Sequence, residues 1–159
     1  MDIPDAEPIA ALRDIVNQLR ADTGASRTTI RVDCPALGLE MASVAAESLD
    51  DGARSLKGQR TPNVHGSAAV RWLRANKRTF VMEDCLNPWN PEVAPEDYVI
   101  ELYGIRSEMV SGVFQGEALI GVVSVHYTKG VRTWSDEEVG MIEAACRAVR
   151  DIIDDVENG

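Results

Sequence analysis

The clearest hydrophobic pattern in the chain is a pair of apolar runs joined by a short polar turn. The runs cover residues 104–114 and 118–127, and Gln115-Gly116-Glu117 separates them. Two runs rich in Val and Ile around a glycine-containing turn of three residues predict a β-hairpin. Because the second run is apolar on both faces, we expect it to be a central strand of a sheet that is covered on both sides.

The segment after the hairpin predicts a long amphipathic helix. Ser135 and Glu138 have the spacing of a capping box, in which each side chain bonds the backbone N–H of the other residue. Apolar residues then recur at spacings of three and four from Val139 to Val156, and a second apolar set widens this stripe. An apolar face this wide can serve two neighbours, so we expect contacts with both the sheet and another helix.

The first half of the chain predicts one helix and two strands. A helix that opens at Pro4-Asp5 is expected from Pro8 to about Asp22, and a strand from Thr28 to Asp33. The segment from Glu40 to Glu47 is expected to be a second strand, with a helix as the alternative. The segment from Ser48 to His65 is rich in Gly, Pro, Asp and Arg and predicts a long loop or mobile lid, a kind of loop that is often functional.

Shorter elements follow before the hairpin. We expect a short helix starting at Gly66-Ser67, a strand over Thr79 to Met82, irregular chain from Asn87 to Pro95, and about two helical turns from Glu96 to Tyr103. This order of elements predicts an α+β domain in which an antiparallel sheet lies between helices.

Composition narrows the function classes. The 159 residues predict one domain, 1–159, with its core at about 8–156. No apolar run approaches the about 18 to 20 residues of a membrane helix, and the acidic N-terminus does not have the layout of a signal peptide, so we expect a cytoplasmic protein without membrane contact. The net charge of -10 argues against a large nucleic-acid surface.

The three cysteines, Cys34, Cys85 and Cys146, have no metal-ligand spacing and leave an odd count. A disulfide framework and a metal site are therefore not expected.

The hairpin and the last helix together resemble the GAF domain family. The resemblance is strongest from Ile105 to Ile153 and extends by element order to Ile9. At Gly112 the chain departs from the family, whose members often carry Pro there. The residues that carry the resemblance are Tyr103-Gly104-Ile105-Arg106-Ser107, Gly116, Leu119-Ile120-Gly121-Val122-Val123-Ser124-Val125, and Arg132-Thr133-Trp134-Ser135-Asp136-Glu137-Glu138.

The resemblance implies an antiparallel sheet of five or six strands with the first and last helices on one face. On the other face, short helices and loops would roof a pocket for a small molecule. It further implies a non-enzymatic, regulatory domain without a cofactor, which dimerises through its terminal helices and signals through a protein partner. The wide apolar face of the last helix agrees with dimerisation.

Side-chain alternation suggests which residues line the pocket. If Ile30 and Val32 face the terminal helices, Arg31 faces the pocket, and Ser111, Ser124 and His126 are expected beside it. A buried arginine needs an anionic partner, so we expect an anionic or aromatic ligand with Arg31 as its anchor. The alternatives are that Arg31 pairs with an internal carboxylate or is exposed near the strand end.

Four further residues are candidates for ligand contacts. His65 is either solvated or closes over the pocket, and Tyr103 lies at an entrance. Arg106 and Glu108 form either a surface ion pair or ligand contacts. The candidate ligand-binding set is therefore Arg31, His65, Tyr103, Arg106, Glu108, Ser111, Ser124 and His126, and no residue is expected to be catalytic or to bind a metal.

Two other functions remain open. Free methionine-(R)-sulfoxide reductases share this fold, and Ser107-Glu108-Met109-Val110 is similar to a substrate-binding stretch of theirs. However, His65-Gly66 stands where they carry Cys-Gly, which leaves only Cys34 and Cys85 for thiolate chemistry. The third function is a dimerisation module whose pocket is filled by its own side chains. Bilin attachment would need a suitably placed cysteine, and haem binding a histidine within 87–103, where there is none.

Overall fold

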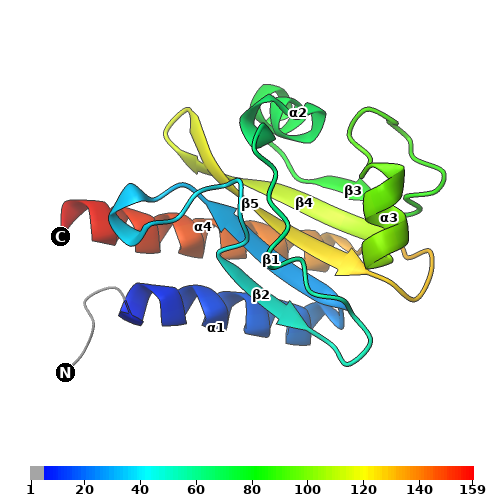
Figure 1. Cartoon of the computed structure of the whole chain (residues 1–159), viewed down its shortest axis with the longest axis horizontal. Coiled ribbons are helices and arrows are strands. Elements are labelled where there is room, and N and C mark those ends of the chain that lie inside the picture. Colours follow the sequence, from blue (N-terminus) through cyan, green and yellow to red (C-terminus); the bar gives the residue numbers. More distant parts are fainter. Residues whose placement is uncertain (1–5) are drawn as a thin grey trace.

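The computed structural model describes residues 6–159, and these form a five-stranded antiparallel sheet with helices on both faces (Figure 1). The strand order is β2-β1-β5-β4-β3. The predicted α+β class is confirmed, with five strands. The elements are α1 (Ala6–Thr23), β1 (Arg27–Val32), the 3-10 turn η1 (Pro35–Leu37), β2 (Ala46–Leu49), the 3-10 turn η2 (Val64–Gly66), α2 (Ala68–Asn76), β3 (Phe80–Met82), α3 (Asp97–Tyr103), β4 (Ser107–Gln115), β5 (Ala118–Tyr127) and α4 (Asp136–Asn158).

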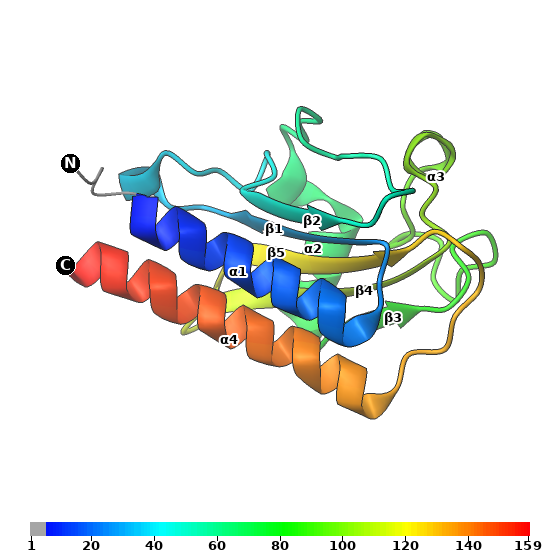
Figure 2. The same ribbon diagram turned by 90° about the horizontal axis from the view of Figure 1, so that it is seen from below.

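The long helices α1 and α4 lie side by side under one face of the sheet (Figure 2). The opposite face, called here the roof face, is covered by α2, α3 and the loops that join them to the strands (Figure 1). Strand β5 pairs with both β1 and β4 and is therefore central, as its apolar sequence predicted. The first and last described residues lie at the same end of the molecule in both views.

The largest core cluster fills the space between the sheet and the two long helices. Its members are fully or nearly fully buried. One hydrogen bond also links the sheet to α1 in this layer, from Thr28 Oγ1 to the carbonyl of Val16 at 2.7 Å. Burying side chains of this size contributes about 1.5 to 3 kcal/mol each, so this layer is the main source of stability. The cluster includes Leu12, Val16, Ile30, Val32, Met109, Val113, Val123, Val125, Ile142, Val149 and Ile153.

The start of α4 has the predicted capping box. Ser135 Oγ accepts from the Glu138 N–H at 3.1 Å, and the Glu138 carboxylate accepts from the Ser135 N–H at 3.0 Å. The residue before the cap, Trp134, is buried and donates its indole N–H to Ser107 Oγ on β4 at 2.8 Å. These bonds fix where the last helix begins against the sheet.

The second strand begins later than the sequence predicted. Residues 40–45 form a turn instead of a strand or a helix, and β2 starts at Ala46. The turn is held by Asp33, whose Oδ1 accepts from the Met41 N–H at 2.8 Å, a tertiary bond that the local pattern does not reveal. The helix start proposed at Pro4-Asp5 lies outside the described residues.

A β-bulge interrupts the alternation of β5. The pairs Val113–Gly121 and Phe114–Leu119 leave Ile120 as an extra residue. Leu119 consequently packs on the roof face and Ile120 toward the long helices. Strict alternation would place Leu119 on the same face as Val123, so the bulge reverses the face at this end of the strand.

Candidate functional site

A cavity of about 400 Å³ lies between the roof face of the sheet and the elements that cover it. The loop between β2 and η2, the helix α2, the segment 92–96 and the helix α3 supply the roof. The cavity walls are mostly apolar, which is typical of small-molecule sites, and polar groups lie on both the floor and the roof. The wall residues include Leu56, Val64, Val70, Leu73, Phe80, Val93, Val99, Ile105, Val110 and Val122.

Five polar side chains of the sheet form the floor of this cavity. They come from the three central strands and stand on the roof face because each strand alternates in direction. Four of the candidate residues are among them, and alternation had assigned three of these, Arg31, Ser124 and His126, to this face. The five are Thr29 and Arg31 on β1, Glu108 on β4, and Ser124 and His126 on β5.

A fully buried arginine, Arg27, lies at one end of this floor, one residue before the predicted start of the strand. Its Nε and Nη2 donate to the Arg54 carbonyl at 2.9 and 2.6 Å, and Nη2 also donates to the Tyr103 carbonyl at 2.9 Å. Nη1 donates to His126 Nδ1 at 3.1 Å. Arg27 therefore joins the loop between β2 and η2, called here the roof loop, to the end of α3 and the central strand β5.

His126 is buried between Arg27 and Glu108. Since a guanidinium has no acceptor, Nδ1 must accept from Arg27, and the ring proton is on Nε2. That proton faces Glu108 Oε2, which is 3.4 Å from Nε2. Burial lowers the pKa of His126, although the nearby Glu108 carboxylate acts in the opposite direction, so the ring is neutral at pH 7.

The result is a buried chain of donors and acceptors from Arg27 through His126 to Glu108. The Glu108 side chain is only 5% exposed and lines the cavity. A carboxylate that is nearly free of water and has one long contact retains capacity to accept further hydrogen bonds. It is the group on the floor best placed to bind a donor on a ligand.

Arg31 faces the cavity as predicted, but its side chain is already engaged. Its Nη1 donates to the carbonyls of Ala42 at 2.8 Å and Met41 at 3.3 Å, in the turn before β2. Burial lowers the pKa of Arg31, and the charge of Glu47 partly offsets this. Within residues 6–159, Arg31 has no ion pair with a carboxylate, and its side chain is not fully exposed. Its position therefore matches neither of the two alternatives.

The roof loop is anchored at its middle. The carboxylate of Glu47 accepts from the Ser55 hydroxyl and, at 2.7 Å, from the Leu56 N–H, next to the Arg54 carbonyl that Arg27 holds. Beyond this anchor, the side chain of Gln59 lines the cavity, and its buried Oε1 has no hydrogen-bond partner within residues 6–159. An orphaned acceptor here is a further point at which a ligand donor can bind.

Ser111 does not belong to this cavity, contrary to expectation. It shares the face of Met109 and Val113, so it points toward α4, where its Oγ lies 2.8 Å from Thr79 Oγ1. The same alternation that places Arg31 on the roof face places Ser111 on the opposite one.

The other three candidates also lie apart from the cavity lining. Exposed His65 pairs with Asp33 Oδ2 at 2.7 Å and accepts from Arg74 at 2.8 Å. Arg106 forms its ion pair with Asp84, at 3.0 Å, instead of with Glu108, and this bond lowers the pKa of Asp84. Tyr103 contributes its carbonyl and its ring, whose centroid is 5.8 Å from the Arg27 guanidinium carbon.

The cysteines are buried outside the cavity lining. Cys34 lies in the core beneath the sheet, and Cys85 lies in a separate cluster near Ile105. Burial raises the pKa of the Cys85 thiol, which disfavours the nucleophilic thiolate. Across residues 6–159 there is no group of three metal-ligating side chains and no helix long and apolar enough to cross a membrane.

The protein has three layers: two terminal helices, an open antiparallel sheet, and a roof of short helices and loops that covers a cavity with polar side chains on its floor. This arrangement defines a class of α+β domains. A family model for the GAF domain matches residues 7–152, so the chain belongs to the GAF domain family. No curated protein matches the chain.

Solved GAF-containing photoreceptors have a similar fold. The blue-light absorbing form of the Thermosynechococcus elongatus PixJ GAF domain superposes with a TM-score of 0.71 and 16% identity, covering 99% of this chain and 90% of that one. A phycocyanobilin-bound GAF domain from a cyanobacterial phytochrome gives 0.70 and 18%, covering 99% and 98%. The chromophore-binding domain of a bacteriophytochrome from R. palustris gives 0.73 and 18%, covering 96% and 57%. At these identities the likeness concerns the fold.

Proposed function

We propose that this GAF domain is a non-enzymatic regulatory domain that binds a small molecule in the cavity of the roof face. The observation that carries the proposal is the buried chain Arg27–His126–Glu108, which ends at the cavity floor and is anchored to the roof at its other end. An apolar cavity with a few converging polar groups is the usual form of a ligand site.

The charges of the lining favour a ligand that donates hydrogen bonds. Arg31 is occupied by two carbonyls, whereas Glu108 on the floor and Glu92 and Glu96 at the rim are carboxylates, and Gln59 offers an orphaned acceptor. We therefore propose an aromatic ligand with N–H donors in place of an anion. Its flat body would pack on the apolar walls while its donors bind Glu108 and Gln59.

A covalently attached bilin does not fit this cavity. The photoreceptor relatives that carry bilins have the same fold, but no cysteine of residues 6–159 lines the cavity here. Cys85 is buried in another cluster, and its thiol has a raised pKa. The proposal therefore concerns a noncovalent ligand.

Signal output would use the roof and the long helices. Ligand contact at Glu108 acts on His126, then on Arg27, and through it on the roof loop and α3, which we propose as the surface read by a protein partner. We further propose a homodimer through α1 and α4. Support for it is a groove of about 460 Å³ between these helices, lined by Ile15, Met141, Ala144, Ala145 and Ala148.

Calorimetric titration of matched aromatic probes tests the ligand class. Adenine and benzamidine carry N–H donors, whereas benzoate presents a carboxylate on the same kind of flat body. We expect wild type to bind at least one of the donor probes and not benzoate. Glu108→Gln should weaken that binding about tenfold or more, because a hydrogen bond to a charged group is lost.

Glu101→Gln is the matched control, since Glu101 is an exposed carboxylate on α3 outside the cavity lining. Its affinity should equal that of wild type. Binding of benzoate alone, or binding of a donor probe that Glu108→Gln leaves unchanged, would contradict this assignment of the site.

A further inference from the structure

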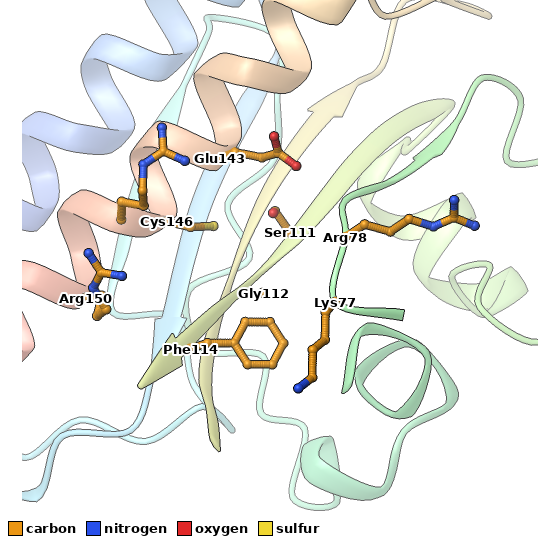
Figure 3. Close-up of a pocket in the computed structure, with 9 residues that line it drawn as sticks. Lys77, Arg78, Ser111, Gly112, Phe114, Glu143, Cys146 and Arg150 are labelled. Atoms are coloured by element: carbon orange, nitrogen blue, oxygen red, sulfur yellow. The ribbon is translucent and has the colours of Figure 1, made fainter. Parts of the chain in front are cut away.

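A second cavity, of about 320 Å³, lies at the β3 edge of the sheet, next to α4 (Figure 3). It is bounded by β4, by the connection from α2 to β3, and by α4. Its lining shares no residue with the cavity of the roof face. We propose that this edge cavity binds a small organic phosphate, independently of the ligand proposed above.

The charge around the edge cavity is opposite to that of the whole chain. Four of its nine lining residues are cationic and one is a carboxylate, whereas the chain has 16 basic and 26 acidic residues. Two further carboxylates, Glu117 and Asp151, pair with lining cations at the surface. Cations gathered around a concave site attract a small anion. The four cations are Lys77, Arg78, Arg147 and Arg150.

The donors of these cations are only partly used within the protein. Arg147 has no ion pair among residues 6–159, and Arg150 pairs with Asp151 at 3.1 Å on the surface. Such exposed pairs contribute little, so a phosphate can compete with them. Arg78 points away in Figure 3 and lies 5.5 Å from the ring centroid of Trp72, so it contributes charge but no direct contact.

The backbone at Lys77 gives a second, independent observation. Its φ is +52°, which makes it the one non-glycine residue with positive φ in the described part of the chain. It ends α2, and its N–H donates to the Leu73 carbonyl at 2.8 Å. Glycine is the usual residue at this position, so a lysine here strains the backbone and places an ammonium group on the cavity rim.

The floor of the edge cavity carries small polar groups. Thr79 Oγ1 donates to Glu143 at 3.0 Å, so Ser111 must be the donor in its bond to Thr79. These bonds give the Glu143 carboxylate, the one anionic group of the lining, one donor, and its charge is outnumbered by the four cations. In Figure 3 the sulfur of Cys146 points from α4 toward Ser111. Burial raises the pKa of this thiol to about 12, so it faces the site as a neutral group.

An apolar wall indicates that the anion has an organic body. Phe114 lines the cavity, and its ring lies against Gly112, where an added Cβ would meet the ring at 2.8 Å. Because Gly112 has no Cβ, it leaves room for the ring. A phosphate group accepts charge-assisted hydrogen bonds from the Arg and Lys side chains. A ring attached to the phosphate would pack against the flat face of Phe114.

Titration with phenyl phosphate tests the inference, with benzenesulfonate as the monoanionic probe of the same shape. Lys77→Gly removes the ammonium group but places at this position the residue that its backbone favours, so the fold is retained or stabilised. Arg147→Ser removes the unpaired guanidinium. We expect each variant to weaken phenyl phosphate binding about tenfold at constant ionic strength.

Arg13→Ser is the control, because Arg13 is exposed on α1, away from the edge cavity. It and Glu108→Gln should bind phenyl phosphate like wild type. No binding by wild type, equal binding of benzenesulfonate, or unchanged binding in both Lys77→Gly and Arg147→Ser would overturn the inference. None of these results depends on the roof cavity, so the two proposals fail separately.

Discussion

Arg27 and His126, 99 residues apart in the sequence, form a buried hydrogen bond of 3.1 Å that fixes which nitrogen of the histidine carries its proton. The bond directs the Nε2 proton toward Glu108 and the cavity. The same guanidinium holds the carbonyls of Arg54 and Tyr103. One side chain therefore sets the polarity of the floor and the position of the roof.

Replacing Arg27 should be strongly destabilising. Arg27→Met leaves two part-buried carbonyls and a buried histidine nitrogen without a donor, and an unpaired buried group costs about 1 to 3 kcal/mol. We expect the free energy of unfolding, measured by urea denaturation, to fall by about 3 kcal/mol or more. Arg13→Met, an exposed arginine on α1, should change it by less than about 0.5 kcal/mol. Similar values for both variants would show that the buried bonds contribute nothing.

Stability should decline in mild acid because of His126. Its pKa in the folded protein is lowered chiefly by burial and further by Arg27 and Arg31, with Glu108 opposing. A histidine of the unfolded chain has a pKa of about 6.5, so below that pH the unfolded state binds more protons. The contribution of neutral His126 is therefore complete above about pH 6.5 and is lost as the pH falls toward the folded pKa.

Urea denaturation between pH 7.5 and 5.0 measures this effect. His126→Gln retains hydrogen-bonding groups but does not titrate, so its stability should change less over this range than that of wild type. Equal slopes for the two proteins would rule out His126 as the source of the pH dependence.

Two adjacent isoleucines of α4 should behave differently. Ile153 is fully buried against the sheet, so Ile153→Ala should cost about 2 to 5 kcal/mol of stability. Ile152 is half-buried, one helical turn after the groove residue Ala148, and serves as the test of dimerisation. Ile152→Glu should reduce the sedimentation coefficient with little loss of helicity. A wild type that sediments as a monomer at micromolar concentration would contradict the proposed dimer.

The thiols should be unreactive in the folded protein. All three cysteines are buried, and the pKa values of Cys85 and Cys146 are raised. We expect slow labelling by Ellman's reagent until urea is added, and no turnover of free methionine-(R)-sulfoxide with dithiothreitol. His65→Cys, which places a thiol at an exposed site, is the control and should label rapidly. Rapid labelling of Cys85 in wild type would revive the reductase alternative.

The sequence predicted the layers of the fold well, because periodicity reports burial directly. Alternation along β1 and β5 also placed Arg31, Ser124 and His126 on the correct face. Arg27 has the same parity as Arg31, but the strand was expected to begin at Thr28, so this arginine fell outside the pattern.

The remaining errors come from bonds between distant segments. The turn held by Asp33 displaces the start of β2, and the bulge at Ile120 reverses the alternation within one strand. The anchor of the roof loop on Glu47 is likewise a tertiary contact. Hydrophobic patterns describe which face of an element is buried, but they contain no information about these partners.

The start of α1 and the end of α4 lie at the same end of the molecule, and this placement has a mechanical consequence. Within a longer polypeptide, a domain built this way would be attached as a side branch, because the chain would enter and leave through the same pole. Tension along such a polypeptide would pull the two helices apart from that pole before it loaded the strands and the roof. Joining the two ends by a short linker and opening the chain elsewhere should accordingly preserve the architecture.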